Sequence, residues 1–252
     1  MMTALNTGLL FLLGAVLGSF ANVCIWRLPR GESIIWPPSH CPRCQKKLSP
    51  WQMVPILSWL LLKGKCGHCG GRISLRYPLV ETTTAVIFAA IGYTWGPSVL
   101  SLQYCILSLA LIISVATDFS HREIPDQVSL GASAVLAFLA LILGRWGNLL
   151  GGVLLFGILF LIAVLSKGGM GGGDIKLALA IGLGLGWRLG LLALALAVLT
   201  GGVVSVVMLL MGQRKKALPF APFLAIGAWL AMFFGHRLLD LYISVVFMLG
   251  TW

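Results

Sequence analysis

Residues Leu189–Met211 read LGLLALALAVLTGGVVSVVMLLM and contain no charged side chain. About 20 consecutive apolar residues cross the hydrocarbon core of a bilayer as an α-helix, so this stretch predicts a membrane span. The whole chain of 252 residues has the same character, with 59% hydrophobic residues, 10% charged residues and a mean hydropathy of +0.98. A soluble domain carries about 25% charged residues. We therefore expect an all-α polytopic membrane protein, because a β-barrel would show alternating rather than continuous apolar residues.

Similar apolar stretches recur along the chain and predict about eight transmembrane helices. They are Leu5–Trp26, Leu79–Thr94, Val99–Ala116, Val128–Leu143, Leu149–Leu165, Ile175–Gly186, Leu189–Met211 and Phe220–Phe234. A further stretch, Leu238–Leu249, either prolongs the last helix or lies along the membrane interface. The first stretch has no basic residue before it, and the chain then returns repeatedly to the membrane. Both features favour a retained helix over a signal peptide.

The distribution of Lys and Arg predicts the orientation of these helices, because basic residues collect in the cytoplasmic loops of membrane proteins. Of the 18 Lys and Arg residues, only Arg145, Arg188 and Arg237 lie on one side of the predicted helices. The others, which include Arg214, Lys215 and Lys216, lie in the segment 27–76 or in loops on its side. We therefore place that segment in the cytoplasm and both termini outside. The net charge of +11 then reflects topology rather than nucleic-acid binding.

Four cysteines lie in the predicted cytoplasmic segment, as Cys41-Pro-Arg-Cys44 and Cys66-Gly-His-Cys69. Two C-x2-C pairs on tight turns typically bring four thiolates to one tetrahedral Zn²⁺ ion. A segment of about 50 residues needs such a staple, because it is too small to form a large core. We interpret the zinc site as structural, since four protein ligands leave no open position for water. A complete set of cysteines makes His68 unnecessary as a ligand.

Two of the seven acidic residues, Asp118 and Asp174, are candidate catalytic groups. Asp118 ends the third apolar stretch and Asp174 opens the sixth, so both fall on the cytoplasmic side. Only about 20 Å of helix separates Asp174 from Trp187, which is less than the ~30 Å of the hydrocarbon core. Asp174 should therefore begin below the membrane surface. The glycine-rich residues 168–173 would then form non-helical backbone that lines an aqueous cavity.

Two carboxyl groups that share one proton are the arrangement found in aspartyl proteases. One activates a water molecule as general base, and the other, protonated, polarises the scissile carbonyl. A glycine-rich strand beside Asp174 would let an extended substrate backbone approach the acid. The spacing leaves simpler interpretations open. Asp118 would then be a solvated residue at a helix end, and Asp174 a helix N-terminal residue paired with Lys176 or Lys167.

Taken together, these motifs resemble those of the type IV prepilin peptidase family, which are membrane GxGD aspartyl proteases that serve type IV pili and type II secretion. The matching residues span nearly the whole chain. They are Gly18–Pro29, the two cysteine pairs, Arg76–Glu81, Asp118 with Ile124-Pro125-Asp126, Gly169–Leu177 and Leu218–Phe223. One departure is Ala221, where the family often has Gly, and we expect only a packing consequence from it.

The resemblance implies roles for several residues. Asp118 and Asp174 would be the catalytic pair, supported by Gly171, Gly173 and Lys176 in the active-site loop. The substrates would be prepilins or pseudopilins with a short basic leader and a hydrophobic N-terminal helix, cut at the cytoplasmic face of the bacterial inner membrane. The family also associates the cysteine-bearing module with N-methylation of the new terminus by S-adenosylmethionine. A methyltransferase activity is therefore implied, without any residue assigned to its cofactor.

These inferences divide the chain into three regions. We expect a first transmembrane helix in residues 1–26, a cytoplasmic tetra-cysteine zinc module and methyltransferase region in 27–78, and a transmembrane aspartyl peptidase domain in 79–252. Membrane lipid is an expected partner and nucleic acid is not. One alternative is an ion- or proton-coupled transporter with Asp118 and Asp174 as relay groups, although it predicts paired broken helices. The other is a zinc-stabilised membrane scaffold in which the glycines serve helix packing.

Overall fold

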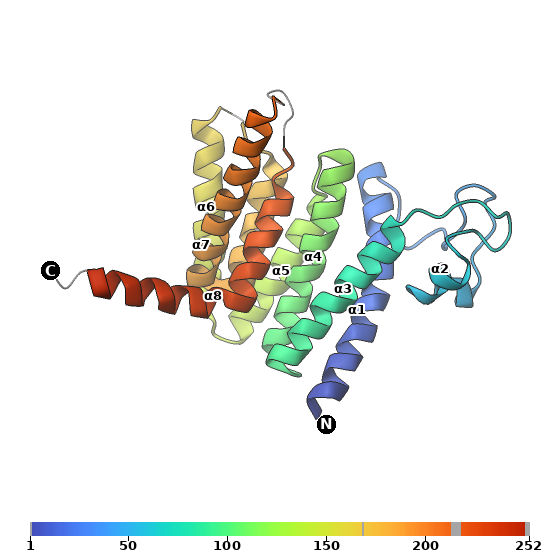
Figure 1. The fold of residues 1–252 in the computed structure, drawn as a ribbon, viewed down its shortest axis with the longest axis horizontal. Helices are drawn as coiled ribbons and strands as arrows, with labels where there is room; N and C mark the ends of the chain where they lie inside the picture. Colours follow the sequence, from blue (N-terminus) through green and yellow to red (C-terminus); the bar gives the residue numbers. More distant parts are fainter. Residues whose placement is uncertain (1, 168, 213–217, 250–252) are drawn as a thin grey trace. The chain divides into compact units, whose positions relative to one another are not determined.

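The structure is a computed structural model that describes residues 2–167, 169–212 and 218–249 (Figure 1). These residues form helices joined by loops, and they contain no β-strand beyond isolated bridges. The expected all-α fold is therefore confirmed for the described part of the chain. Gly168, Arg214, Lys215 and Lys216, which entered the predictions above, lie outside the described residues.

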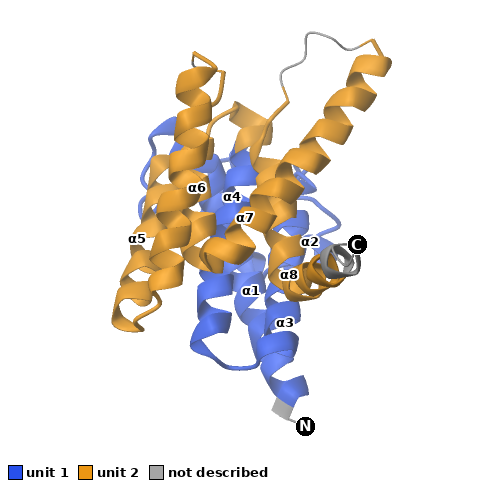
Figure 2. Ribbon diagram, turned by 90° about the vertical axis from the view of Figure 1, so that its left-hand side faces the viewer, with its two compact units in different colours: residues 1–117 blue, residues 118–252 orange. Residues whose placement is uncertain are grey.

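Two compact units make up the chain, residues 1–117 and residues 118–252 (Figure 2). The first unit holds the cysteine-bearing segment and the helices around it. Its elements are α1 (Met2–Arg27), η1 (Leu28–Arg30), η2 (Pro50–Met53), α2 (Leu57–Leu61), α3 (Arg76–Trp95) and most of α4 (Val99–His121). The segment between α1 and α3 consists mainly of loops, as expected for an extramembrane module.

Helices α1 and α3 pack closely through glycines. A Cβ atom at Gly14 would lie 2.8 Å from the backbone of α3, and one at Gly18 would lie 2.7 Å from it. Glycines four residues apart let helix backbones approach in this way within membranes. Asn22 continues the contact, because its side-chain amide donates a hydrogen bond of 3.1 Å to the carbonyl oxygen of Tyr77. The cysteine-bearing segment is therefore connected to a tightly packed helix pair.

The second unit contains the end of α4 and four further helices, α5 (Asp126–Ile142), α6 (Trp146–Leu165), α7 (Gly172–Leu210) and α8 (Ala221–Leu249). Helix α7 is broken at Gly186, whose φ of 78° and ψ of 171° glycine adopts without steric cost. A Cβ atom at Gly190 would lie only 3.5 Å from the Cα atom of Gly182. Residues eight positions apart in a straight helix are separated by about 12 Å. The chain therefore reverses at Gly186, between two stretches that the sequence already separates.

Among the described helices, five are long and apolar enough to cross a membrane, namely α1, α4, α6, α7 and α8. Helix α5 is apolar but shorter. Helix α3 is less apolar, since it begins with Arg76 and carries Glu81 followed by Thr82–Thr84. These helices support a membrane protein, whereas the expected number of spans stays a prediction.

The stretch Leu238–Leu249 belongs to α8 and prolongs it. Figure 1 shows this last part of the helix running at a steep angle to the first part. The helical continuation is therefore confirmed, whereas the position of this stretch along the membrane interface stays a prediction.

Candidate active site

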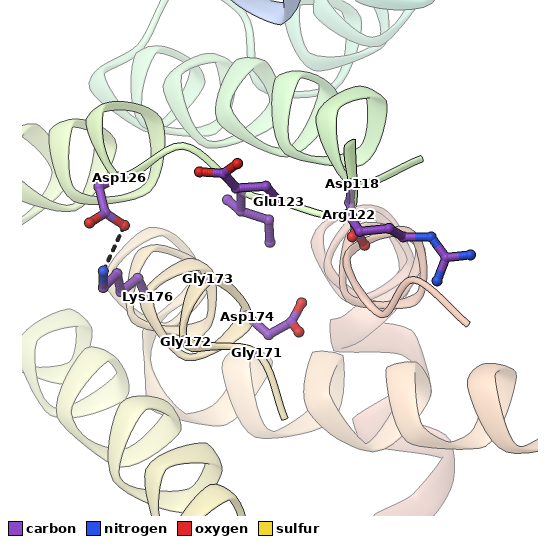
Figure 3. A pocket seen from close by; sticks show the side chains of 10 residues that line it. Asp118, Arg122, Glu123, Asp126, Gly171, Gly172, Gly173, Asp174 and Lys176 are labelled. Carbon is purple, nitrogen blue, oxygen red and sulfur yellow. Dashed lines mark hydrogen bonds and ion pairs between the residues drawn. The ribbon is translucent and has the colours of Figure 1, made fainter. Parts of the chain in front are cut away.

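Asp118 and Asp174 line the same cavity, of about 290 Å³, in the second unit (Figure 3). Asp118 lies near the end of α4 and is only 7% exposed. Asp174 lies in the first turn of α7. Figure 3 shows its side chain directed toward the end of α4 that carries Asp118. The structure thus brings together the two acids singled out from the sequence, from separate helices.

The start of α8 holds the Asp118 carboxylate. Its Oδ2 accepts a hydrogen bond of 3.2 Å from the backbone N–H of Ala221, the first residue of α8. The first N–H groups of a helix have no partner within the helix, and the helix dipole there favours a negative charge. A backbone N–H is common to alanine and glycine, so the expected packing consequence of Ala221 stays a prediction. Its side chain is fully buried, but its backbone also contacts a candidate catalytic group.

Helix α7 begins inside the glycine-rich segment. Gly171 is the N-cap, with φ −69° and ψ 138°, and Gly172 and Gly173 already belong to the helix. The backbone N–H of Asp174 donates to the carbonyl oxygen of Gly171 over 3.2 Å and closes the first turn. The expectation that residues 168–173 are all non-helical is therefore wrong for the last two. The extended part beside Asp174 is correspondingly shorter than expected.

The three glycines that precede Asp174 have different surroundings. A Cβ atom at Gly173 would lie 2.8 Å from the Cβ atom of Ile124, too close for both segments to stay in place. At Gly171 a Cβ atom would lie 3.3 Å from Oδ2 of Asp174, whereas at Gly172 nothing lies within 4 Å. The G-x-G-D pattern therefore has a physical basis here. Its first glycine leaves room for the Asp174 carboxyl group, and its second leaves room for Ile124.

Lys176 forms an ion pair with Asp126 rather than with Asp174. Its Nζ lies 2.6 Å from Oδ1 of Asp126, the first residue of α5, and both side chains are partly exposed. The pairing of Asp174 with Lys176, which the sequence left open, is therefore wrong. Oδ1 of Asp174 is buried and has no hydrogen-bond partner among the described residues. Buried polar atoms normally have a partner, so this oxygen is available to a water molecule or a substrate in the cavity.

Four cavity-lining residues were not assigned to the site from the sequence, namely Arg122, Glu123, Ile124 and Asp126. Their position between Asp118 and the start of α5 is the signal that could have identified them. With Glu123 included, four of the seven acidic residues of the chain line this cavity, Asp118, Glu123, Asp126 and Asp174. These four acidic residues outnumber the two basic residues of the lining, Arg122 and Lys176, and an excess of negative charge attracts positively charged segments.

The first unit contains a candidate metal centre formed by Cys41, Cys44, Cys66 and Cys69. Their Sγ atoms all lie within 4.8 Å of one another, and Sγ of Cys41 is 4.0 Å from Sγ of Cys69. Sulfur atoms around a tetrahedral Zn²⁺ ion, each about 2.3 Å from the metal, are about 3.8 Å apart. The four thiols therefore fit a four-coordinate metal ion, and the expected clustering is confirmed.

Both cysteine turns are closed by the same backbone hydrogen bond. The N–H of Cys41 donates to the carbonyl oxygen of Lys46 over 3.0 Å, and the N–H of Cys66 donates to that of Gly71 over 2.8 Å. His68 contributes through its backbone, because its N–H donates to Sγ of Cys66 and lowers the pKa of that thiol to about 7. The thiolate is the form that binds metal, so this turn is prepared for coordination.

Comparisons with known proteins cover both units. A model described as Bacterial Peptidase A24 N-terminal domain matches residues 12–95, and one described as Type IV leader peptidase family matches residues 105–206. A protein of Bacillus subtilis (strain 168) is 39% identical over 243 residues, covering 94% of this chain and 98% of the relative. One of Pseudomonas aeruginosa is 32% identical over 271 residues, covering 92% of each.

Both relatives are named prepilin leader peptidase/N-methyltransferase. No solved structure matches the chain. The identity, the coverage and the two family models agree over most of its length, and the chain therefore belongs to the type IV leader peptidase family.

Proposed function

We propose that this chain is a membrane aspartyl endopeptidase that removes the leader peptide of type IV prepilins or type II secretion pseudopilins and then N-methylates the new N-terminus. The observation that carries the peptidase activity is the placement of Asp118 and Asp174, from two helices, around one cavity. The names of the relatives combine the same two activities. The transporter alternative is not supported, because α7 is the only helix broken at a glycine among the described residues, and paired broken helices were expected.

The two carboxyl groups divide the hydrolysis between them. Asp118, whose charged form is stabilised by the N–H of Ala221, takes a proton from a water molecule as that water attacks the scissile carbonyl carbon. Asp174 in its protonated form donates a hydrogen bond, and then its proton, to the oxygen of the scissile carbonyl. Its buried Oδ1 has no hydrogen-bond partner among the described residues and is therefore available for this contact. The proton held by Asp118 passes to the leaving amine as the C–N bond breaks, and Asp174 takes back a proton from a hydroxyl group of the tetrahedral intermediate as the product carboxyl group forms.

The acidic lining of the cavity supports a basic leader as the segment bound beside the cleavage site. Asp118, Glu123, Asp126 and Asp174 line it together with only two basic side chains, Arg122 and Lys176. In a membrane protein such a cavity concentrates a positively charged segment near the catalytic acids. The hydrophobic helix that follows the leader in a prepilin would remain in the bilayer.

We place the cavity at the cytoplasmic face of the bacterial inner membrane, with both termini outside. The spans in this proposal are α1, α3, α4, α5, α6, the two halves of α7, and α8. The first half of α7, from Gly172 to the break at Gly186, is about 20 Å long, and a bilayer core is ~30 Å thick. Asp174 then begins below the inner surface, where the cavity would supply water to it.

We assign residues 27–78 to a zinc module and methyltransferase region, between the first helix in residues 1–26 and a peptidase domain in residues 79–252. The Cys41, Cys44, Cys66 and Cys69 thiolates would hold a structural Zn²⁺ ion that stabilises this small segment. S-adenosylmethionine would be the methyl donor. The methyl transfer itself rests on the names of the relatives, and no residue is assigned to it.

The proposed function is tested by incubating the purified chain with a prepilin, with and without S-adenosylmethionine, and measuring intact product masses. We expect loss of the leader in both reactions and the addition of one methyl group only with the methyl donor. An uncut prepilin in both reactions would contradict the peptidase proposal, and a cut but unmethylated product would contradict the methyltransferase proposal alone.

Replacing Ala221 by proline should slow leader removal, because proline lacks the N–H that contacts Asp118 but suits the first position of a helix. A hydrogen bond to a charged group contributes about 1.5–3 kcal/mol, which corresponds to a rate loss of roughly 10- to 100-fold. Ala221→Gly keeps the N–H and is the matched control. Steady-state cleavage that is equally fast in both variants would show that this hydrogen bond does not matter.

Replacing Cys41 and Cys66 together by serine should release the bound metal, because the remaining pair supplies only half of the ligand set. Metal analysis of the purified protein should find about one zinc ion per chain before the substitutions and almost none after them. Cys24→Ser is the control, since Cys24 is buried in α1 outside the cluster. Unchanged zinc content in the double variant would rule out this site.

A further inference from the structure

The cysteine-bearing segment exposes a group of apolar side chains around α2. We call them the α2 patch; they are Trp51, Met53, Val54, Leu57, Leu60 and Leu61, and each is between 42% and 75% exposed. Trp59 faces the other way, because its indole N–H donates to the carbonyl oxygen of Ile73 over 3.3 Å. The short helix therefore turns its leucines away from the module. Exposed apolar groups of this size mark a surface that binds a partner or a membrane.

The position of α2 along the helix pair shows which surface it faces. The backbone N–H of Ile56, just before α2, donates to Oε2 of Glu81 over 2.7 Å. Glu81 lies about 7 Å along α3 from Arg76, the first residue of that helix. It packs against Gly18, and Gly18 lies about 13 Å along α1 before the last residue of that helix. Helix α2 therefore begins beside the α1–α3 pair rather than beyond its ends, and Figure 1 shows it there.

The charge around the patch is of one sign. No acidic residue occurs between Glu32 and Glu81, and this part of the sequence carries seven basic residues, Arg43, Lys46, Lys47, Lys63, Lys65, Arg72 and Arg76. Lys63 and Lys65 directly follow α2. Anionic lipid head groups attract such basic segments, each Lys or Arg contributing about 1 kcal/mol near the surface.

We propose that the α2 patch inserts into the head-group and acyl-chain boundary of the adjacent leaflet, with Lys63 and Lys65 on anionic lipid phosphates. Interfacial helices sit about 5–10 Å into this boundary, which matches the depth set by the bond between Ile56 and Glu81. A basic prepilin leader is a poor occupant, because the surrounding charge would repel it. The module is thereby held against the membrane. This contact requires a membrane protein but does not depend on the proposed peptidase chemistry.

The contact is tested by placing a photoreactive side chain on the patch of the full chain in vesicles of phosphatidylethanolamine and phosphatidylglycerol. Leu61→p-benzoylphenylalanine is the test variant, since Leu61 is 75% exposed. Ile35→p-benzoylphenylalanine is the control, since Ile35 is 85% exposed but lies outside the α2 patch. A hydrogen bond from Arg27 to the carbonyl oxygen of Ser33 holds this part of the chain near the end of α1. After illumination, mass spectrometry should find several-fold more lipid adduct at position 61 than at position 35. Replacing phosphatidylglycerol by phosphatidylcholine should lower the adduct at position 61.

Three results would overturn the proposal. They are equal lipid labelling at both positions, cross-links from position 61 to residues 118–252, and cross-links to an added prepilin in place of lipid. Tryptophan quenching by lipids brominated near the head group provides a second measurement with conservative variants. Trp51→Phe should remove part of the quenched emission, whereas Trp36→Phe, near the end of α1, should not. Quenching that is unchanged by Trp51→Phe would equally contradict insertion.

Discussion

Asp118→Asn and Asp174→Asn should each slow removal of a prepilin leader by about 10³-fold or more, because each substitution removes either the general base or the proton donor of the proposed acid pair. Asparagine has nearly the same shape as aspartate but cannot exchange a proton in this reaction. Both variants should therefore accumulate in the membrane as well as the wild-type protein. The measurement is the initial rate of cleavage of a purified prepilin, followed by product mass.

Asp240→Asn is the matched control for these variants. It removes one exposed carboxylate from α8 and should leave the rate unchanged. Rapid cleavage by either the Asp118 or the Asp174 variant would remove that residue from the proposed mechanism. Reduced accumulation of only the two cavity variants would instead indicate a structural role.

Gly173→Ala should reduce cleavage by about 5- to 150-fold, because overpacking of this kind typically costs 1–3 kcal/mol and here falls on the position of Asp174. The new Cβ atom would lie 2.8 Å from Cβ of Ile124, so the first turn of α7 and the segment before α5 must move apart. Both segments line the cavity, and Asp174 directly follows Gly173. The rate of cleavage and the thermal unfolding midpoint of the purified variant are the two measurements.

Gly172→Ala separates this packing effect from the intrinsic preference of alanine for helices. Both glycines lie in the first turn of α7, and alanine there favours the helix by about 1 kcal/mol over glycine. Nothing lies within 4 Å of a Cβ atom at Gly172, so this variant should keep its activity and should unfold at the same or a slightly higher temperature. Equal losses in both variants would show that the G-x-G-D spacing does not arise from the contact with Ile124.

Side-chain chemistry made several features predictable from the sequence. The long apolar stretches predicted the helices, because few other structures satisfy the backbone inside a bilayer. The spacing of the cysteines predicted that four thiols would meet, and the structure confirms this clustering. The scarcity of acidic residues drew attention to Asp118 and Asp174, which line one cavity. Their catalytic roles stay a prediction.

Backbone groups and long-range contacts explain what the sequence did not reveal. The backbone N–H of Ala221 contacts Asp118, which is 103 residues away in the sequence. Every residue except proline has this donor, so the residue type does not predict the contact. Lys176 forms its ion pair with Asp126, although Asp174 is closer to it in the sequence. The pair forms because the start of α5 lies beside α7, and no local sequence pattern predicts that contact. The hydrogen bond from the backbone N–H of Ile56 to Glu81, which sets the position of α2, likewise joins a backbone donor to a residue far away in the sequence.

The most direct test of the proposed acid pair is the single-turnover rate of the double variant Asp118→Asn with Asp174→Asn, measured with enzyme in excess over prepilin. Catalytic groups that act as a unit lose their whole effect at the first substitution, so the double variant should be no slower than the slower single variant. If the two losses multiply instead, the carboxyl groups act independently, and a shared proton in one cavity cannot account for the reaction.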